Sequence, residues 1–176
     1  MMQIVLAHGA SGNADSMRPH VDGLRRRGLE ALAIDLPKRR AEAAVAAYRA
    51  ALAKTADDRQ TLIGGHSYGG RVASLLAAEQ PVGGLVLLSY PLHRPGNAEW
   101  EPRVAHWPLI GCPVLVLSGE ADPFARLELL QQAVTRLRQA ELVTYPRVGH
   151  GLGPVLDEAL DRIAAFAAGL TSRANP

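Results

Sequence analysis

Short apolar segments recur along the chain and alternate with longer segments that have helical spacing. Most of the short segments carry hydrophobic residues at consecutive positions, which is typical of parallel strands that are buried on both faces. Six strands are therefore predicted, at residues 3–7, 30–34, 61–65, 84–89, 113–118 and 141–145.

Hydrophobic residues three or four positions apart predict amphipathic helices between these strands. The stripes are Met17, Val21 and Leu24; Val45, Tyr48 and Leu52; Leu127, Leu130, Val134 and Leu137; and Leu156, Leu160, Ile163 and Ala167. A further helix is predicted from Arg71 to Glu79, before Pro81. This alternation predicts an α/β fold, a doubly wound, mostly parallel six-stranded sheet with helices on both faces. Ligands of such sheets bind beyond the carboxyl ends of the strands, so chemistry is expected in the strand-to-helix loops.

One domain is expected over residues 1–168, followed by a C-terminal tail at residues 169–176. The 176 residues are 48% hydrophobic, which is enough to build one compact core. Neither an internal repeat nor a low-complexity linker interrupts the pattern. Residues 90–111 are the one long stretch expected to be irregular.

Charge and composition exclude several classes of partner. The net charge is only +2, and the basic triplets at 25–27 and 38–40 are expected on solvated surfaces, so no nucleic-acid partner is predicted. The single cysteine, Cys112, cannot form an intrachain disulfide and is expected to be an inert residue beside a strand. No segment approaches 18 apolar residues and the N-terminus enters a strand at once, so no membrane association and a cytoplasmic location are expected.

The segment Gly-Gly-His-Ser-Tyr-Gly-Gly at residues 64–70 follows a predicted strand and opens a predicted helix. In that context Gly-x-Ser-x-Gly predicts a nucleophile elbow, a strained turn that exposes the central Ser67. A Cβ at Gly65 or Gly69 would clash with the neighbouring backbone in such a turn. The alternative is an ordinary glycine-rich turn in which Ser67 caps the helix.

A serine hydroxyl needs a base within hydrogen-bond reach, and the base needs a partner that fixes its tautomer. Asp122 follows the fifth predicted strand, and His150 follows the sixth, between two glycines. The order Ser67, Asp122, His150 is that of an α/β-hydrolase triad, which predicts these three as catalytic residues. Asp122 could also cap a helix that starts at Pro123, and Glu120 is a rival for the acid.

Hydrolysis of an acyl group also requires N–H donors for the negative charge that develops on the attacked oxygen. The Tyr68 amide, at the start of the predicted helix, is one candidate. The loop at residues 8–12, His-Gly-Ala-Ser-Gly, offers the second, with Ala10 favoured and Ser11 next. This loop lacks the glycine spacing and the lysine of a phosphate-binding loop. No cofactor and no metal site are predicted, since the sequence has no cluster with ligand-like spacing.

With these motifs in place, the chain resembles the α/β-hydrolase superfamily from residue 3 to about residue 168. Residues 65–71, 88–93 and 122–124 look like the small family that contains the hydrolase-like domain of a histone-acetyltransferase complex subunit and its testis-expressed relatives. Dienelactone hydrolases are more distant. The resemblance implies a minimal fold without a cap domain, the triad named above, and a cleft bordered by Tyr90 and His93, but no particular substrate.

Three functions are compatible with these residues. The main hypothesis is a serine hydrolase that cleaves a carboxylic ester or thioester of a small-molecule acyl substrate through an acyl-serine intermediate. The second is a non-catalytic interaction module that keeps the hydrolase fold, because fold does not fix function. The third keeps the triad but catalyses another reaction, as a lyase or a perhydrolase does. The sequence leaves acyl size and oligomeric state open.

Overall fold

The fold is built around a single parallel sheet. The computed structural model describes residues 1–55, 57 and 59–174. The strand order is β2-β1-β3-β4-β5-β6, and every neighbouring pair is parallel. The strands are β1 Gln3–Ala7, β2 Glu30–Ile34, β3 Leu62–His66, β4 Gly84–Leu88, β5 Val114–Gly119 and β6 Ala140–Tyr145. The predicted doubly wound fold is confirmed, and each predicted strand end lies within one residue of the observed end.

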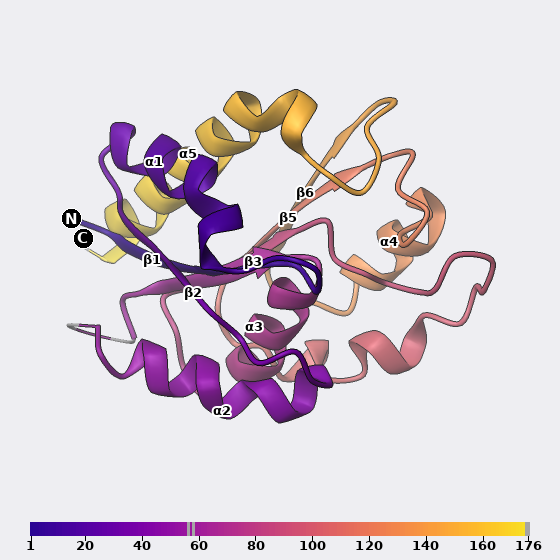
Figure 1. The fold of residues 1–176 in the computed structure, drawn as a ribbon, viewed down its shortest axis with the longest axis horizontal. Coiled ribbons are helices and arrows are strands. Elements are labelled where there is room, and N and C mark those ends of the chain that lie inside the picture. Colours follow the sequence, from indigo (N-terminus) through magenta and orange to yellow (C-terminus); the bar gives the residue numbers. More distant parts are fainter. Residues whose placement is uncertain (56, 58, 175–176) are drawn as a thin grey trace.

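Five α-helices of the described chain cover the two faces of the sheet (Figure 1). They are α1 Arg18–Arg26, α2 Ala41–Leu52, α3 Tyr68–Glu79, α4 Leu127–Val134 and α5 Leu156–Ala174. Helices α1 and α5 lie on one face, and α2, α3 and α4 lie on the other. The described residues include no separate cap domain between the strands.

Two hydrophobic cores result from the alternation of side chains along each strand. In β1, Ile4 and Leu6 pack in the core under α1 and α5, whereas Val5 and Ala7 pack in the core under α2 and α3. All four side chains are fully buried. Burial on both faces explains why this strand is apolar at successive positions in the sequence.

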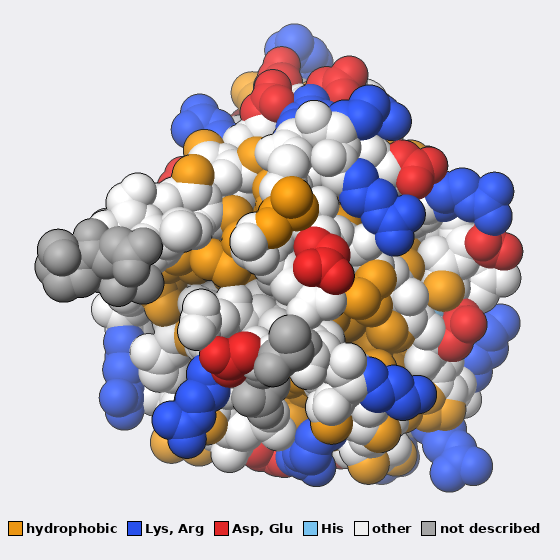
Figure 2. Space-filling model, turned by 90° about the vertical axis from the view of Figure 1, so that its left-hand side faces the viewer, with side chains coloured by type: hydrophobic (Ala, Val, Ile, Leu, Met, Phe, Trp, Pro, Cys, Tyr) orange, Lys and Arg blue, Asp and Glu red, His pale blue; other side chains and the backbone are white. Residues whose placement is uncertain are grey.

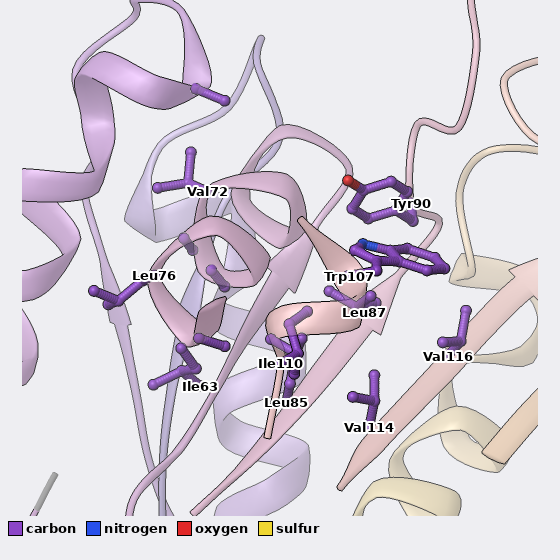
Figure 3. Packing of buried hydrophobic residues seen from close by; sticks show 14 of the residues in the cluster. Ile63, Val72, Leu76, Leu85, Leu87, Tyr90, Trp107, Ile110, Val114 and Val116 are labelled. Atoms are coloured by element: carbon purple, nitrogen blue, oxygen red, sulfur yellow. The ribbon is translucent and has the colours of Figure 1, made fainter. Parts of the chain in front are cut away.

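The stretch at residues 90–111 is more ordered than predicted. It contains two short 3₁₀ helices, η2 Glu101–Val104 and η3 Trp107–Leu109. Trp107 is fully buried and packs edge-on against Tyr90, with ring centroids 5.0 Å apart, above Leu87 of β4 (Figure 3). The stretch therefore extends the core on the α3 side of the sheet.

The segment predicted as a tail is largely helical. Helix α5 continues to Ala174, well past the predicted boundary at residue 169, and residues 175–176 lie outside the described part of the chain. Leu170 packs against the core under α1 and α5, and the hydroxyl of Thr171 donates to the carbonyl of Ala167 at 3.1 Å. A tail was expected from residue 169, but the helix continues through Gly169 because Leu170 still has a core to cover.

Tyr48 of α2 makes hydrogen bonds to β1 and to β3, the strand that leads into the nucleophile elbow. Its hydroxyl accepts the N–H of Gly64 at 2.9 Å and lies 2.8 Å from the carbonyl oxygens of Val5 and Gly64. The side chain is fully buried, and burial raises the pKa of its hydroxyl well above the usual value. The hydroxyl therefore stays protonated and supplies one hydrogen bond to a strand carbonyl.

Candidate active site

Ser67 occupies a strained turn between β3 and α3. Its backbone has φ 49° and ψ −112°, in a region that residues other than glycine rarely adopt. The Ser67 amide donates to the carbonyl of Leu88 at 2.8 Å, and the Ser67 carbonyl accepts the amide of Arg71 at 3.0 Å. The serine stands at the N-cap position of α3, but its side chain makes no capping hydrogen bond. Its hydroxyl is thus available to another partner.

Two glycines of the elbow allow this turn to approach β1. A Cβ on Gly65 would lie 2.4 Å from the carbonyl oxygen of Ala7, and a Cβ on Gly69 would lie at the same distance from the same oxygen. Both distances are far below van der Waals contact, and the obstacle is backbone that cannot move aside. The steric reason given for these glycines in the sequence therefore holds in the structure.

The side chains of Ser67, His150 and Asp122 form a continuous hydrogen-bonded chain. Nε2 of His150 lies 2.8 Å from Oγ of Ser67, and Nδ1 of His150 lies 2.8 Å from Oδ2 of Asp122. A carboxylate only accepts, so Nδ1 carries the proton and Nε2 is left to accept the serine hydroxyl. The structure thus brings the three predicted residues together from the loops after β3, β5 and β6.

The rival roles of the acidic residues are resolved by their contacts. Helix α4 begins at Leu127, so Asp122 does not cap it, and its Oδ1 instead accepts the amide of Phe124 at 2.8 Å. Glu120 points toward β6, where its Oε1 accepts the hydroxyl of Thr144 at 2.8 Å. Asp122 and not Glu120 is the partner of His150.

The loop that follows β1 lies against the elbow. His8, which is buried, donates from Nδ1 to the carbonyl of Gly9 at 2.7 Å and accepts the amide of Leu36 at Nε2 at 3.0 Å, and these bonds fix the start of the loop. Within the described part of the chain, the amides of Ala10 and Tyr68 donate to no protein acceptor. Both are therefore available to bind an oxygen of a ligand.

Tyr90 and His93 do not line the cleft, so that prediction is wrong. Tyr90 is fully buried, and its hydroxyl donates to the carbonyl of Arg103 at 2.6 Å. His93 is 2% exposed and accepts the amide of Arg126 at 3.0 Å. Both polar groups satisfy backbone partners inside the loops that follow β4 and β5, so they hold those loops and face no solvent.

Two side chains next to the motif residues flank the ring of His150. The centroid of Phe124 lies 4.5 Å from that of His150, and the centroid of His66 lies 5.2 Å away. In the sequence, His66 is the residue between Gly65 and Ser67 in the Gly-x-Ser-x-Gly motif, and Phe124 ends the Asp-Pro-Phe segment, but neither was given a role. The sequence offered one indication of these contacts, because His66 lies next to Ser67 and Phe124 lies two residues after Asp122.

Neither Cys112 nor a group of possible metal ligands forms a second site in the described part of the chain. Burial raises the pKa of the Cys112 thiol to about 11, so it is not a thiolate at neutral pH. Among the described residues, no three His, Cys, Asp or Glu side chains are grouped to hold a metal ion. No helix in this part of the chain has the length and hydrophobicity needed to cross a bilayer.

A surface cavity of about 380 Å³ lies away from Ser67. It is lined by residues at the start of β5 and β6 and by α5, among them Val114, Ala140 and Phe166. All six strands run in the same direction. The cavity lies where β5 and β6 begin and Ser67 lies where β3 ends, so the two are at opposite ends of the strands. The edge near both termini shows hydrophobic side chains interspersed with acidic and basic ones (Figure 2).

The fold and the site together define an α/β-hydrolase, and comparison with known proteins agrees. A family model described as an alpha/beta hydrolase domain matches residues 1–165. The chain therefore belongs to the α/β-hydrolase family, as the elbow and the order of the triad predicted. The narrower resemblance, to the hydrolase-like domain of a histone-acetyltransferase complex subunit, stays a prediction.

Solved structures share this fold at low sequence identity. A monoacylglycerol lipase from Paleococcus ferrophilus has a TM-score of 0.83 and 14% identity, covering 96% of this chain and 94% of that chain. Est1E from Butyrivibrio proteoclasticus, bound to ferulic acid, has a TM-score of 0.81 and 17% identity, covering 98% of this chain and 90% of that chain. A thioesterase domain from the curacin biosynthetic pathway has a TM-score of 0.75 and 15% identity, covering 95% and 90%.

Proposed function

We propose that this chain hydrolyses a carboxylic ester or thioester through an acyl-Ser67 intermediate. The observation that carries the proposal is the pair of 2.8 Å contacts that His150 makes, one with Ser67 and one with Asp122. Contacts of this length, with the proton on Nδ1, are what a general base needs to take the serine proton. The substrate class is a small molecule with an acyl group.

In the first half of the reaction, Nε2 of His150 accepts the Ser67 proton as Oγ attacks the carbonyl carbon. Buried Asp122 keeps the ring oriented and stabilises the imidazolium that forms. The negative charge on the former carbonyl oxygen is bound by the Tyr68 amide and by the amide of Ala10 or Ser11. His150 then gives its proton to the departing alcohol or thiol, which leaves the acyl group on Ser67.

In the second half, water takes the place of the departed alcohol or thiol. Nε2 of His150 removes one proton from this water, and the resulting oxygen attacks the acyl-Ser67 carbonyl. Collapse of the second tetrahedral intermediate breaks the bond to Oγ, which recovers its proton from His150. The products are a carboxylic acid and the original enzyme, so the cycle needs no cofactor. Solved structures with the same fold include a lipase, an esterase domain and a thioesterase domain, which supports esters and thioesters as the first substrates to test.

The test is labelling by a fluorophosphonate probe of the wild type, of Ser67→Ala and of Ser89→Ala. Ser89 is a matched control because it too follows a strand and has a positive φ, of 50°, but its side chain is fully buried. The proposal predicts labelling of the wild type and of Ser89→Ala, and none of Ser67→Ala. An unlabelled wild type that also turns over no 4-nitrophenyl ester would favour the non-catalytic interaction module instead.

A further inference from the structure

His66 connects the elbow to the loop that carries His150. Its Nε2 lies 3.0 Å from the backbone carbonyl oxygen of His150. A carbonyl only accepts, so Nε2 of His66 carries the proton and donates it. The loop between β6 and the 3₁₀ helix η4 (Gly153–Val155) carries His150, whose side chain contacts Ser67. The hydrogen bond from His66 holds the main chain of this loop at His150 itself.

The other edge of the His66 ring rests on the loop after β1. A Cβ on Gly9 would lie 2.9 Å from Nδ1 of His66, closer than ordinary contact, so the ring packs against a position where only glycine fits without a shift. Gly9 directly precedes Ala10, one of the amides proposed to bind the oxyanion. The His66 ring thus lies between two loops, the one that carries His150 and the one that carries Ala10.

The environment of His66 favours its neutral form. Burial lowers the pKa of its ring, and the nearby His150 ring lowers it further, while the His150 carbonyl and the Asp122 carboxylate oppose the shift. A neutral His66 ring still donates from Nε2. Its centroid lies 5.2 Å from that of His150, and a neutral ring there places no second positive charge beside His150 when His150 takes up a proton. The group is therefore suited to hold His150 and not to exchange protons itself.

We propose that His66 is a positioning residue, whose Nε2–H bond to the His150 carbonyl sets the placement of the general base relative to both Ser67 and the oxyanion loop. This inference rests on the proposed function. It assigns a purpose to the variable position of the elbow, which the motif itself leaves unspecified. Small displacements of a catalytic group by about 1 Å can cost on the order of 100-fold in rate, so the bond is expected to affect kcat more than KM.

The test compares His66→Leu, which removes the donor, with His66→Gln, whose amide nitrogen can stand where Nε2 stands. His106→Leu is the matched control, because His106 is also partly buried and hydrogen-bonded through Nε2, to Oγ of Ser74 at 2.8 Å, but on another side of the fold. For a 4-nitrophenyl ester, kcat of His66→Leu is expected to fall about 10- to 100-fold with KM within about twofold of wild type. The Gln variant is expected to recover most of kcat, and His106→Leu to keep it.

A second readout separates positioning from general stability. The proton on Nδ1 of His150, hydrogen-bonded to Asp122, gives a downfield NMR resonance that is expected to shift or broaden in His66→Leu and to persist in His66→Gln. The proposal is overturned if His66→Leu keeps wild-type kcat, or if the Gln variant loses as much as the Leu variant. If His66→Leu does not fold, His66→Asn replaces it, since its amide is one methylene too short to reach. Failure of the proposed function would be distinct, because the wild type itself would then be unlabelled and inactive.

Discussion

Asp122 holds His150 with one oxygen of a fully buried carboxylate while its other oxygen is held by the main chain. Oδ2 lies 2.8 Å from Nδ1 of His150, and Oδ1 accepts the Phe124 amide at 2.8 Å. Because the Phe124 bond prevents the carboxylate from rotating, Oδ2 stays directed at the histidine. The ring is thereby kept in the tautomer that leaves Nε2 unprotonated and facing Ser67.

Replacing Asp122 by asparagine is expected to lower kcat by about 10³- to 10⁴-fold, since an amide can keep the Phe124 contact but can present N–H to the ring and favour the wrong tautomer. The measurement is steady-state hydrolysis of a 4-nitrophenyl ester. Glu120→Gln is the matched control, because Glu120 bonds to Thr144 and not to His150. Equal losses in the two variants would contradict the assignment of Asp122 as the acid.

Gly69→Ala is expected to abolish activity, because the added Cβ would lie 2.4 Å from the Ala7 carbonyl oxygen and the elbow would have to move. Gly149→Ala, although next to His150 in the chain, places its Cβ in open space and is expected to keep activity. Fluorophosphonate labelling and circular dichroism of both variants check this. Labelling of Gly69→Ala at the wild-type rate would show that the elbow has room that the structure does not give it.

The elbow and the order of the triad were predictable because they depend on local rules. A serine between glycines, after an apolar strand and before a helix, has few conformations available to it, so its placement follows from sequence. Asp122 and His150 follow because parallel strands end at the same edge of the sheet. The sequence favoured Asp122 over Glu120, and the structure adds the reason: the Phe124 amide holds one carboxylate oxygen while the other contacts His150.

Tyr48→Phe tests the hydrogen bonds beneath the elbow. Removing this buried hydroxyl removes its hydrogen bonds to the main chain of β1 and β3, which is expected to cost about 0.5–1.5 kcal/mol of unfolding free energy. Urea unfolding followed by circular dichroism measures the loss. An unchanged midpoint would mean that these strand groups find other partners once the hydroxyl is gone.

Acid is expected to destabilise the fold through two partly buried histidines. Burial lowers the pKa of His20 and of His106 from the ordinary 6.5 to about 4, so each is neutral in the folded state where the unfolded chain takes up a proton. The unfolded state then binds more protons between pH 6.5 and 4, and the free energy of unfolding falls as pH falls through that window. Urea midpoints at pH 7 and pH 5 measure this loss.

His106→Gln provides the comparison for the acid effect. It removes one of the two titrating rings, so the midpoint should fall less between pH 7 and pH 5 than in the wild type. The same fall in both proteins would assign the acid sensitivity to other groups. The variant keeps His20, whose remaining contribution gives an internal check on the size of the effect.

The contacts that sequence did not reveal are those that depend on how loops pack. Tyr90 and His93 were expected at the cleft, but both are buried and satisfy main-chain groups. The role proposed for His66 depends on a carbonyl 84 positions further along the chain, which no local pattern indicates. Loops joined across the sheet in this way are fixed by tertiary packing and not by propensity.

The acyl-Ser67 intermediate is the central claim, and peptide mass mapping tests it most directly. The wild type is mixed with a 4-nitrophenyl ester, quenched in acid during turnover and digested. The account predicts an acyl adduct on the peptide that contains Ser67, and neither adduct nor turnover in Ser67→Ala. Turnover that persists in Ser67→Ala, or an adduct on a different residue of the wild type, would contradict it.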